Sequence, residues 1–399
     1  MSKTGFLGIV FPKYTYIWGI QSPNMIKRSL EEKIEKRFGT GKAILLIGPR
    51  QVGKTTLFNK LLEDKEYLFL NGDDPTVRKL LANPNLEQLK NIIGNYRIVF
   101  IDEAQRIDNI GLTLKLITDQ IKAVQLLVSG SSAFELNNHT QEPLTGRKWE
   151  YQLYPISWAE FESHVGYLKA EQQLELRVVY GMYPDVITNF GEEKEILKQL
   201  TDSYLYKDIL SYGGIRKPEI LEKLLRALAF QIGSEVSYNE LAQLLGIDKK
   251  TVATYIDVLC QAYVIFKLPS FSKNLRNEIK TNQKIYFYDT GVRNMIIGDL
   301  NPIEIRQDKG NLWENFLIAE RLKQNAYTGS LAKGYFWRTV SQQEIDYVEE
   351  EAGKLKAFEM KWNPNTKVKL PKAFIKAYNA EITVINRTNF REFLNSIKR

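Results

Sequence analysis

The eight residues from Gly48 to Thr55, GPRQVGKT, follow the apolar run Ala43–Ile47 and precede a segment with helical spacing. A strand, a glycine-rich loop and a helix in this order form the phosphate-binding loop of many nucleotide-binding proteins. The glycines let backbone N–H groups close around phosphates, a lysine reaches the β and γ oxygens, and a hydroxyl binds Mg²⁺. We therefore predict a site for a nucleotide and Mg²⁺, formed by Gly48, Pro49, Arg50, Gln51, Val52, Gly53, Lys54, Thr55 and Thr56.

Two acids, Asp102 and Glu103, follow the strongly apolar run Ile98–Ile101. Hydrolysis of a nucleotide needs an acid that orients the metal and a group that activates water. We expect Asp102 to lie beside the Mg²⁺ that Thr55 binds, and Glu103 to polarise the attacking water. Lys54 and Glu103 are therefore predicted catalytic residues.

Further polar residues are candidates for the same site. The next apolar run ends in hydroxyls at Ser129, Ser131 and Ser132, which would suit a sensor near the γ-phosphate, although an ordinary Ser/Gly turn is the alternative for Ser131 and Ser132. Arg147 is a third predicted catalytic residue, which would stabilise charge on the transferred phosphoryl group from a neighbouring subunit. A surface arginine is the alternative there. The role of Arg147 implies a homo-oligomer.

Composition excludes several other kinds of site. The chain has 399 residues, with one cysteine and two histidines, so an intramolecular disulfide and thiolate or histidine metal clusters are excluded. A reducing cytoplasm fits this cysteine usage best. No run of eighteen apolar residues occurs, and we predict no membrane span. Residues 1–24 lack a convincing cleavage site, and we interpret them as an N-terminal extension rather than a signal peptide.

The order of patterns predicts three domains after that extension. From residue 25 to 165, apolar runs alternate with helical patterns, which predicts an α/β fold with a parallel sheet covered by helices. Residues 166–275 have mainly helical spacing. Within them, two short helices joined at Gly246 and followed by an extended segment predict a winged helix-turn-helix. Residues 276–399 form a second α/β pattern.

Positive charge is concentrated near the C-terminal end. Residues 353–399 contain eleven Lys/Arg and three Glu, which equals the +8 of the whole chain. A basic face attracts DNA or RNA, whereas solvated lysines around a small domain are the alternative. The second helix of the helix-turn-helix would present five residues on or near its outer face, Lys249, Lys250, Thr251, Thr254 and Tyr255. Such helix pairs also serve as protein-packing elements.

A predicted hairpin at residues 344–360 carries a second group of acids. If its turn is centred on residues 352–353, Asp346 faces Glu359 and Glu344 faces Lys361, all on one face. Two opposed carboxylates repel unless a cation lies between them. A nearby lysine is the usual third element of Mg²⁺-dependent phosphodiester cleavage.

Glu314, on the preceding predicted helix, would complete this metal shell with Asp346 and Glu359, next to Lys361. Two alternatives involve no metal. Asn311-x-x-Glu314 matches a capping box at a helix start, which alone would explain the acid. Glu344 and Lys361 could form a cross-strand salt bridge.

Short motifs along the chain together resemble a large prokaryotic family of AAA+-type P-loop ATPases. In the first half they are GPRQVGKTT (48–56), FLNGDDP (69–75), IDEAQ (101–105), VSGSS (128–132), LTGR (144–147) and YPISWAEF (154–161). In the second half they are KIYFYDTGVRN (284–294), GNLWENF (310–316), FWRT (336–339), QEIDY (343–347) and FEMK (358–361). The resemblance covers residues 25–383. It implies a RecA-like core, a winged-helix region and a C-terminal domain of uncharacterised function similar to the PD-(D/E)XK restriction-endonuclease class.

Three functions remain open from the sequence. The first is a Mg²⁺-dependent ATPase that couples nucleotide state to DNA engagement. The second is an ATP-gated DNA nuclease that cuts at the acids and lysine of the hairpin. The third is a nucleotide-controlled switch that binds a protein partner or operator without cleavage. The resemblance and the lack of an N-K-x-D motif favour ATP over GTP.

Overall fold

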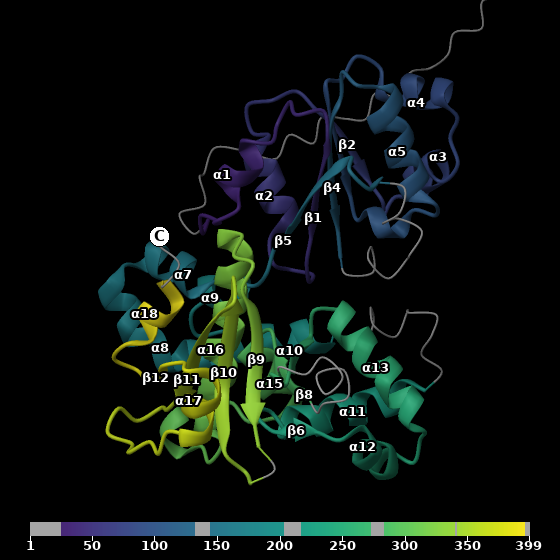
Figure 1. Cartoon of the computed structure of the whole chain (residues 1–399). Coiled ribbons are helices and arrows are strands. Elements are labelled where there is room, and N and C mark those ends of the chain that lie inside the picture. Colours follow the sequence, from purple (N-terminus) through teal and green to yellow (C-terminus); the bar gives the residue numbers. More distant parts are fainter. Residues whose placement is uncertain (1–24, 132–143, 203–216, 273–282, 340, 396–399) are drawn as a thin grey trace, which may run out of the picture.

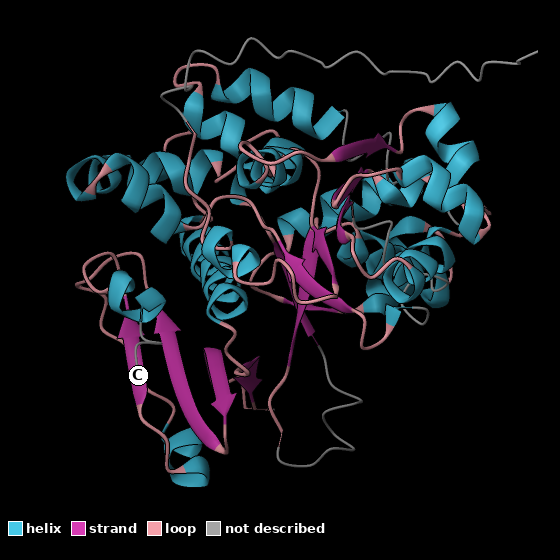
Figure 2. Ribbon diagram, turned by 90° about the horizontal axis from the view of Figure 1, so that it is seen from above, coloured by secondary structure: helices cyan, strands magenta, loops and turns pink. Residues whose placement is uncertain are grey.

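The computed structural model describes residues 25–131, 144–202, 217–272, 283–339 and 341–395. The predicted extension at 1–24 lies outside these ranges. The chain forms an upper lobe, purple to blue in Figure 1, and a lower lobe that contains the remaining helices and strands. Seen from above, the strands at the centre lie among helices, whereas the strands near the C-terminus lie at the edge of the molecule (Figure 2). None of the helices in these ranges combines the length and the apolar composition needed to cross a membrane.

The upper lobe is built on a five-stranded sheet in the order β2-β3-β4-β1-β5, and every pair is parallel. The predicted parallel sheet is confirmed. The central strands are buried on both faces, which explains their continuous apolar runs. The strands are β1 (Ala43–Ile47), β2 (Leu68–Asn71), β3 (Ile98–Asp102), β4 (Gln125–Gly130) and β5 (Lys148–Gln152). The helices are α1 (Glu31–Glu35), α2 (Lys54–Leu61), α3 (Pro75–Leu81), α4 (Leu86–Ile93) and α5 (Ile110–Gln120), with the 3-10 turn η1 (Ala104–Arg106).

The next part of the chain is mainly helical, as expected. Its helices are α7 (Trp158–Val165), α8 (Tyr167–Tyr180), α9 (Pro184–Thr188), α10 (Glu193–Leu200), α11 (Pro218–Phe230), α12 (Tyr238–Leu245), α13 (Lys249–Gln261) and α15 (Thr290–Ile297), and the 3-10 turn η4 (Ile303–Ile305) follows. They enclose a small antiparallel sheet, β6-β8-β7, formed by β6 (Glu235–Val236), β7 (Ile265–Pro269) and β8 (Gln283–Phe287). β8 pairs antiparallel with β7, whereas the predicted domain boundary between residues 275 and 276, which lies outside the described residues, places these two strands in different domains.

The last part contains a four-stranded mixed sheet in the order β12-β11-β10-β9. Three strands pair antiparallel, and β12 runs parallel to β11. Its elements are α16 (Lys309–Thr328), β9 (Lys333–Arg338), β10 (Glu344–Glu351), β11 (Lys354–Met360), α17 (Lys372–Tyr378), β12 (Ile382–Ile385) and α18 (Phe390–Asn395). Trp158 of α7 packs edge-on against Phe316 of α16 and Phe390 of α18, which joins this part to the helical region.

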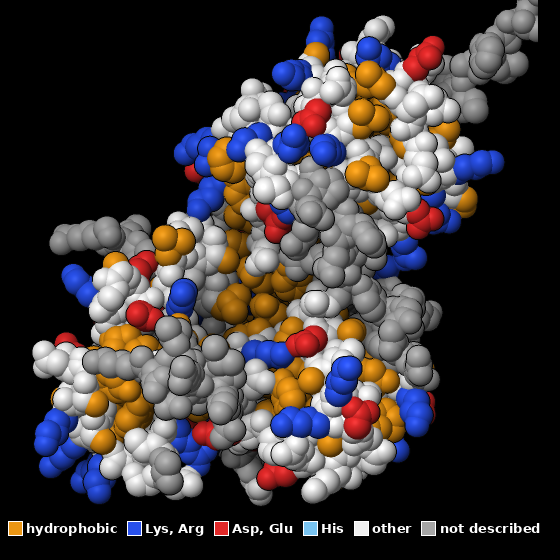
Figure 3. Space-filling view, turned by 45° about the vertical axis from the view of Figure 1, so that its right-hand side comes forward, with side chains coloured by type: hydrophobic (Ala, Val, Ile, Leu, Met, Phe, Trp, Pro, Cys, Tyr) orange, Lys and Arg blue, Asp and Glu red, His pale blue; other side chains and the backbone are white. Residues whose placement is uncertain are grey.

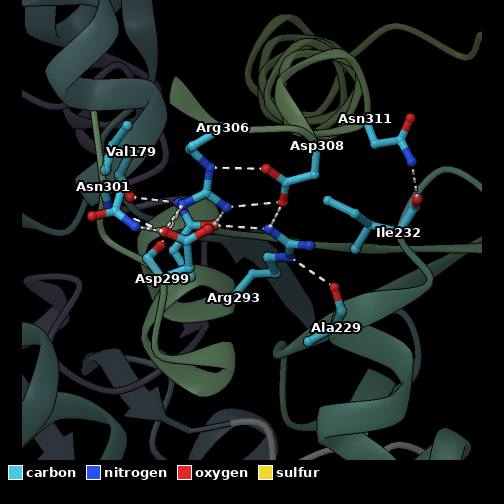
Figure 4. Close-up of polar contacts among 10 residues, drawn as sticks. Val179, Ala229, Ile232, Arg293, Asp299, Asn301, Arg306, Asp308 and Asn311 are labelled. Carbon is cyan, nitrogen blue, oxygen red and sulfur yellow. Dashed lines mark hydrogen bonds and ion pairs between the residues drawn. The ribbon is translucent and has the colours of Figure 1, made fainter. Parts of the chain in front are cut away.

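A buried charged network fixes the N-terminal end of α16 (Figure 4). Arg293 and Arg306 both contact the carboxylate of Asp308, the residue before α16, at 2.5 and 2.8 Å. Arg293 Nε also donates to the carbonyl oxygen of Ala229, in α11, at 2.8 Å. Arg306 pairs with Asp299 at 3.2 Å. Each buried guanidinium thus has an acidic partner, as buried charges require.

The surface is hollowed between the two lobes, and hydrophobic side chains gather there (Figure 3). A pocket at the junction is lined by Leu30, Glu150, Tyr151, Gln152 and Ala326. These residues come from the segment before α1, from β5 and from α16. The edge of the upper sheet therefore faces the C-terminal end of α16.

Candidate functional site

The loop between β1 and α2 requires glycine at two positions for different reasons. A side chain at Gly48 would place its Cβ atom 2.0 Å from the carbonyl oxygen of Leu153. At Gly53 the nearest atom to an added Cβ would be 3.9 Å away, but φ is +90°. Gly48 therefore permits close packing on the chain after β5, whereas Gly53 permits the left-handed turn into α2. The loop consequently presents its N–H groups at a helix N-terminus, which favours anions.

Lys54, the first residue of α2, lies inside this loop and is 5% exposed. Its Nζ atom donates to the carbonyl oxygens of Gly48 and Pro49 at 2.9 and 2.7 Å. Burial lowers the pKa of Lys54 to about 8, although Glu103 and Asp102 act in the opposite direction. An ammonium that has lost its hydration is stabilised by a nearby anion, and phosphate oxygens in the loop would supply one.

Three predicted residues from separate elements meet beside the loop. Thr55 Oγ1 donates to Asp102 Oδ2 at 2.8 Å, and Ser129 Oγ donates to Asp102 Oδ1. They come from the start of α2 and the ends of β3 and β4, which parallel strands bring to one edge. A hydroxyl and a carboxylate oxygen 2.8 Å apart match neighbouring ligands placed about 2.1 Å from an octahedral Mg²⁺. The donor set therefore fits the predicted metal.

Glu103 follows Asp102 in a left-handed conformation, with φ 49°. Its carboxylate accepts a hydrogen bond from Gln105 Nε2, while Gln105 Oε1 accepts from the Ser131 N–H at 3.2 Å. Gln105 thus holds Glu103 near the end of β4. A left-handed non-glycine residue costs on the order of 1 kcal/mol, and such conformations cluster at functional sites. Gln105 was not predicted, although its position three residues after the acid that ends β3 was a usable signal.

Arg147 lies at the end of the sheet where β1 begins, whereas the loop follows the end of β1. It immediately precedes β5, and its carbonyl oxygen accepts from the N–H of Ala43 at the start of β1. The length of β1 places it about 16 Å from Gly48. Its guanidinium pairs with Asp119 at 2.6 Å. Arg147 therefore does not reach the loop of its own chain, and the predicted role in a neighbouring subunit stays a prediction.

Arg28 contacts the loop but was not predicted. It is 6% exposed, and its NH1 atom donates to the carbonyl oxygen of Val52 at 2.6 Å. The sequence around it is rich in basic residues, and its partners lie at least 24 positions away. No local pattern distinguishes Arg28 from a surface arginine.

The predicted register of the hairpin at residues 344–360 is confirmed. Tyr347 faces Phe358 and Val348 faces Ala357. The same register, extended by one residue, places Asp346 opposite Glu359. Lys361 Nζ lies 3.2 Å from Asp346 and 3.0 Å from Glu359. Burial and the charge of Asp346 raise the pKa of Glu359 to about 7. The lysine thus compensates the two acids.

Glu314 has different partners. Its Oε1 atom accepts from Lys284 Nζ at 3.1 Å and from Tyr286 OH at 2.5 Å. Burial raises the pKa of Glu314 to about 7, despite the opposing charge of Lys284. The capping-box alternative is wrong, because α16 begins at Lys309 and Asn311 donates to the carbonyl oxygen of Ile232 instead.

Glu344 does not pair with Lys361, which rules out the predicted cross-strand salt bridge. It contacts Lys284 at 2.5 Å and Arg338 at 3.5 Å. An irregularity in the pairing of β10 with β9, between Ile345 and Val348, shifts the register beside Glu344. Across the described part of the chain, no group of three or more acidic, histidine or cysteine side chains is arranged to hold a metal ion. The metal role of Glu314, Asp346 and Glu359 stays a prediction.

The helix-turn-helix residues divide into two groups. Lys249, Lys250 and Thr254 are exposed on α13, as expected. Tyr255 is buried, so its predicted place on the outer face is wrong, because it follows the apolar spacing of Val252, Ile256 and Leu259. Asp248 caps the helix start, where its carboxylate accepts from the N–H and the hydroxyl of Thr251 at 2.9 and 2.6 Å.

Comparisons with known proteins divide the chain into three matched regions. Residues 40–162 match a family model described as an AAA domain. Residues 171–302 and 309–398 match two domains of unknown function, DUF8612 and DUF4143.

Similar proteins include two uncharacterized ones. One, from Mycobacterium tuberculosis, is 26% identical over 339 residues, covering 84% of this chain and 74% of the relative. Another, from Methanocaldococcus jannaschii, is 24% identical over 343 residues, covering 80% and 74%. A solved Walker-type ATPase of Pyrococcus abyssi aligns over 68% of this chain and 96% of its own, with 16% identity and a TM-score of 0.47. The loop geometry and the match at residues 40–162 agree, so this part of the chain is similar to AAA domains and has the phosphate-binding loop of a nucleotide-binding fold.

Proposed function

We propose that this protein is a Mg²⁺-dependent ATPase that couples its nucleotide state to DNA engagement. The observation that carries the ATPase part is the meeting of Thr55, Asp102 and Ser129 beside the buried Lys54. Thr55 and Asp102 would hold Mg²⁺, which neutralises charge on the β and γ phosphates. Glu103, held by Gln105, would orient and polarise water at the γ-phosphate.

Two surfaces support the DNA part of the proposal. The order α11, β6, α12, α13 and the β7–β8 hairpin is that of a winged helix, with Lys249, Lys250 and Thr254 exposed on the helix that would enter the groove. In the C-terminal domain six lysines are exposed, namely Lys354, Lys356, Lys367, Lys369, Lys372 and Lys376. Lysines of this kind bind phosphates without reading sequence.

ATP hydrolysis by the purified protein, with and without duplex or single-stranded DNA, tests the proposal. We expect Mg²⁺-dependent turnover that Lys54→Ala abolishes, and a DNA affinity that changes between ATPγS and ADP and weakens with salt. Lys60→Ala, on the same helix, is the matched control and should retain turnover. Unchanged hydrolysis in Lys54→Ala would overturn the site, and equal DNA affinity in both nucleotide states would overturn the coupling.

We also propose a homo-oligomer in which Arg147 of one subunit completes the site of the next, because Arg147 does not reach the loop of its own chain. Arg147→Ala alone and Lys54→Ala alone should both be inactive. A mixture of the two variants should regain activity, because some sites then combine an intact loop with an intact arginine. Failure of the mixture to regain turnover, although the variants exchange subunits, would contradict this arrangement.

An ATP-gated nuclease is the second candidate, favoured by Lys361 lying within 3.2 Å of both Asp346 and Glu359. Such a triad would hold Mg²⁺ and activate water for phosphodiester cleavage. Strand breaks seen on a gel only with ATP and Mg²⁺, and lost in Asp346→Asn and Lys361→Met, would support it. Intact DNA throughout, with nucleotide-dependent binding, favours the ATPase without cleavage.

A further inference from the structure

Arg28 makes contacts with four separate parts of the chain. Its NH1 atom donates to the carbonyl oxygen of Val52, in the phosphate loop, at 2.6 Å. Its NH2 atom donates to the carbonyl oxygen of Tyr154 at 2.6 Å and to the hydroxyl of Tyr327 at 3.2 Å. Its Nε atom lies 3.3 Å from the carboxylate of Glu160. Because the side chain is buried, this geometry is protected from competition with water.

The contact with Val52 acts on the nucleotide site through a single peptide group. A trans peptide directs its carbonyl oxygen and its N–H to opposite sides. When Arg28 holds the oxygen of Val52, the N–H of Gly53 must point the other way, toward the interior of the loop. A charge-assisted bond to the oxygen also polarises the peptide and strengthens its N–H as a donor. Arg28 is therefore a positioning residue for a phosphate-binding amide.

The contact with Tyr327 extends the same link to the C-terminal domain. Tyr327 lies in the last turn of α16, and its hydroxyl also accepts from the Tyr154 N–H at 3.0 Å. Lys33 of α1 donates to the Tyr327 carbonyl oxygen. Figure 1 shows this end of α16 rising from the lower lobe toward α1 and β5. Earlier in α16, Arg321 grips Glu349 of β10 with two bonds of 2.7 and 2.5 Å, so the sheet moves with the helix.

Four tyrosine rings gather at this junction. Tyr154 stacks on Tyr288, at the end of β8, with ring centroids 5.5 Å apart. Tyr263, just after α13, packs edge-on against both, and Tyr327 lies 6.0 Å from Tyr154. Tyr263 has φ 54°, which is uncommon for a bulky residue and places its ring in the junction. Tyr263, just after the end of α13, therefore packs on Tyr154, whose carbonyl oxygen accepts from Arg28.

We propose that Arg28 and Tyr327 couple the binding of a nucleoside polyphosphate in the phosphate loop to the position of α16 and the sheet attached to it. The inference rests on the proposed function, because it requires the loop to bind nucleotide. Loop amides that turn toward the phosphates pull on the Val52 carbonyl, and the shared guanidinium passes that change to the Tyr327 hydroxyl. The planar guanidinium of Arg28 has five N–H donors and can contact these acceptors at the same time, whereas a lysine ammonium cannot hold three acceptors in one plane.

Hydrogen exchange of the full-length protein, with and without ATPγS and Mg²⁺, tests the coupling. In the wild type we expect nucleotide to slow exchange of the backbone amides at residues 321–328 by about tenfold. Tyr327→Phe removes only the hydroxyl, and we expect it to bind ATPγS within about threefold of the wild type while the slowing at 321–328 disappears. Arg28→Lys should lose the slowing and also bind ATPγS about tenfold more weakly.

Tyr96→Phe, an exposed tyrosine before β3, is the matched control and should behave as the wild type. Failure of the wild type to bind ATPγS would overturn both this inference and the proposed function. Binding without slower exchange at 321–328 in the wild type would overturn the coupling alone. Slowing that persists in both Tyr327→Phe and Arg28→Lys would do the same, because these variants lack the proposed link in different ways.

Discussion

Replacing Glu314 by Gln should remove part of the pH dependence of stability. Glu314 is buried, and its pKa is about 7 in the folded protein against 4.5 in its reference state. The folded state therefore binds this proton more tightly than the unfolded state. The resulting stabilisation is fully present below pH 4.5 and is lost as the pH rises through 7. Each unit of pKa difference corresponds to about 1.4 kcal/mol, so this group lowers the unfolding free energy by roughly 2 to 3 kcal/mol between pH 5 and pH 8.

Urea unfolding followed by tryptophan fluorescence, at pH 5 and pH 8 in buffer with EDTA, measures this difference. Trp313, the neighbour of Glu314 in sequence, is fully buried and reports on the region. Gln keeps the size of the side chain and an acceptor for Tyr286 but does not ionise. We expect Glu314→Gln to lose less stability than the wild type from pH 5 to pH 8, by roughly 2 to 3 kcal/mol.

Glu222→Gln, an exposed change on α11, is the control and should leave the pH dependence as it is. Glu359 also has a pKa raised to about 7, so a pH dependence of stability should remain in Glu314→Gln and become weaker when Glu359 is also replaced by Gln. The reasoning is refuted if Glu314→Gln shows the wild-type pH dependence. A variant less stable than the wild type at pH 8 would also refute it, because the charge would then stabilise Lys284 more than burial costs.

Three further predictions concern single residues. Lys54→Met should raise the unfolding free energy measured in urea at pH 7 by roughly 3 kcal/mol, because the lysine pKa is lowered from 10.5 to about 8. This penalty is fully present below pH 8 and fades as the pH rises toward 10.5, and an equal or lower stability of the variant would contradict it. Gly48→Ala should lower the thermal midpoint and abolish nucleotide binding, since its Cβ would meet the Leu153 oxygen at 2.0 Å. Gly94→Ala is the control: its Cβ would meet no atom within 4 Å, although φ is +57°, so this variant should lower the midpoint less and retain binding. Burial raises the pKa of the Cys260 thiol to about 12, so in the native protein at pH 8 this thiol should react with a disulfide reagent about a thousandfold more slowly than in urea. Rapid labelling of the native protein would argue against its burial.

The upper lobe could be predicted largely from sequence because its signals are local. Parallel strands buried on both faces read as apolar runs, and polar residues that end them must meet at one edge. This reasoning brought Thr55, Asp102 and Ser129 together correctly. The hairpin register was also local, since a turn at residues 352–353 fixes every pair.

The remainder depends on contacts between distant segments. Arg28 and Tyr327 are 299 positions apart, and no periodicity relates them. Tyr255 was predicted on the outer face of α13 but is buried, because an aromatic residue can serve either face of such a helix and its residue type alone does not show which. Glu314 fitted a capping box by spacing, but the network around Asp308 starts α16 three residues earlier than Asn311 requires.

That network at Asp308 also limits how α16 can respond to anything that acts on its far end. The helix has 20 residues and is therefore about 30 Å long. Two arginines clamp its beginning, so a push at Tyr327 tilts the helix about this fulcrum instead of sliding it along its axis. A displacement of about 1 Å at the Tyr327 end corresponds to a rotation of the helix axis by about 2°. Glu314 sits close to the pivot and hardly moves, whereas Arg321 and the strand it grips travel more than half as far as the tip.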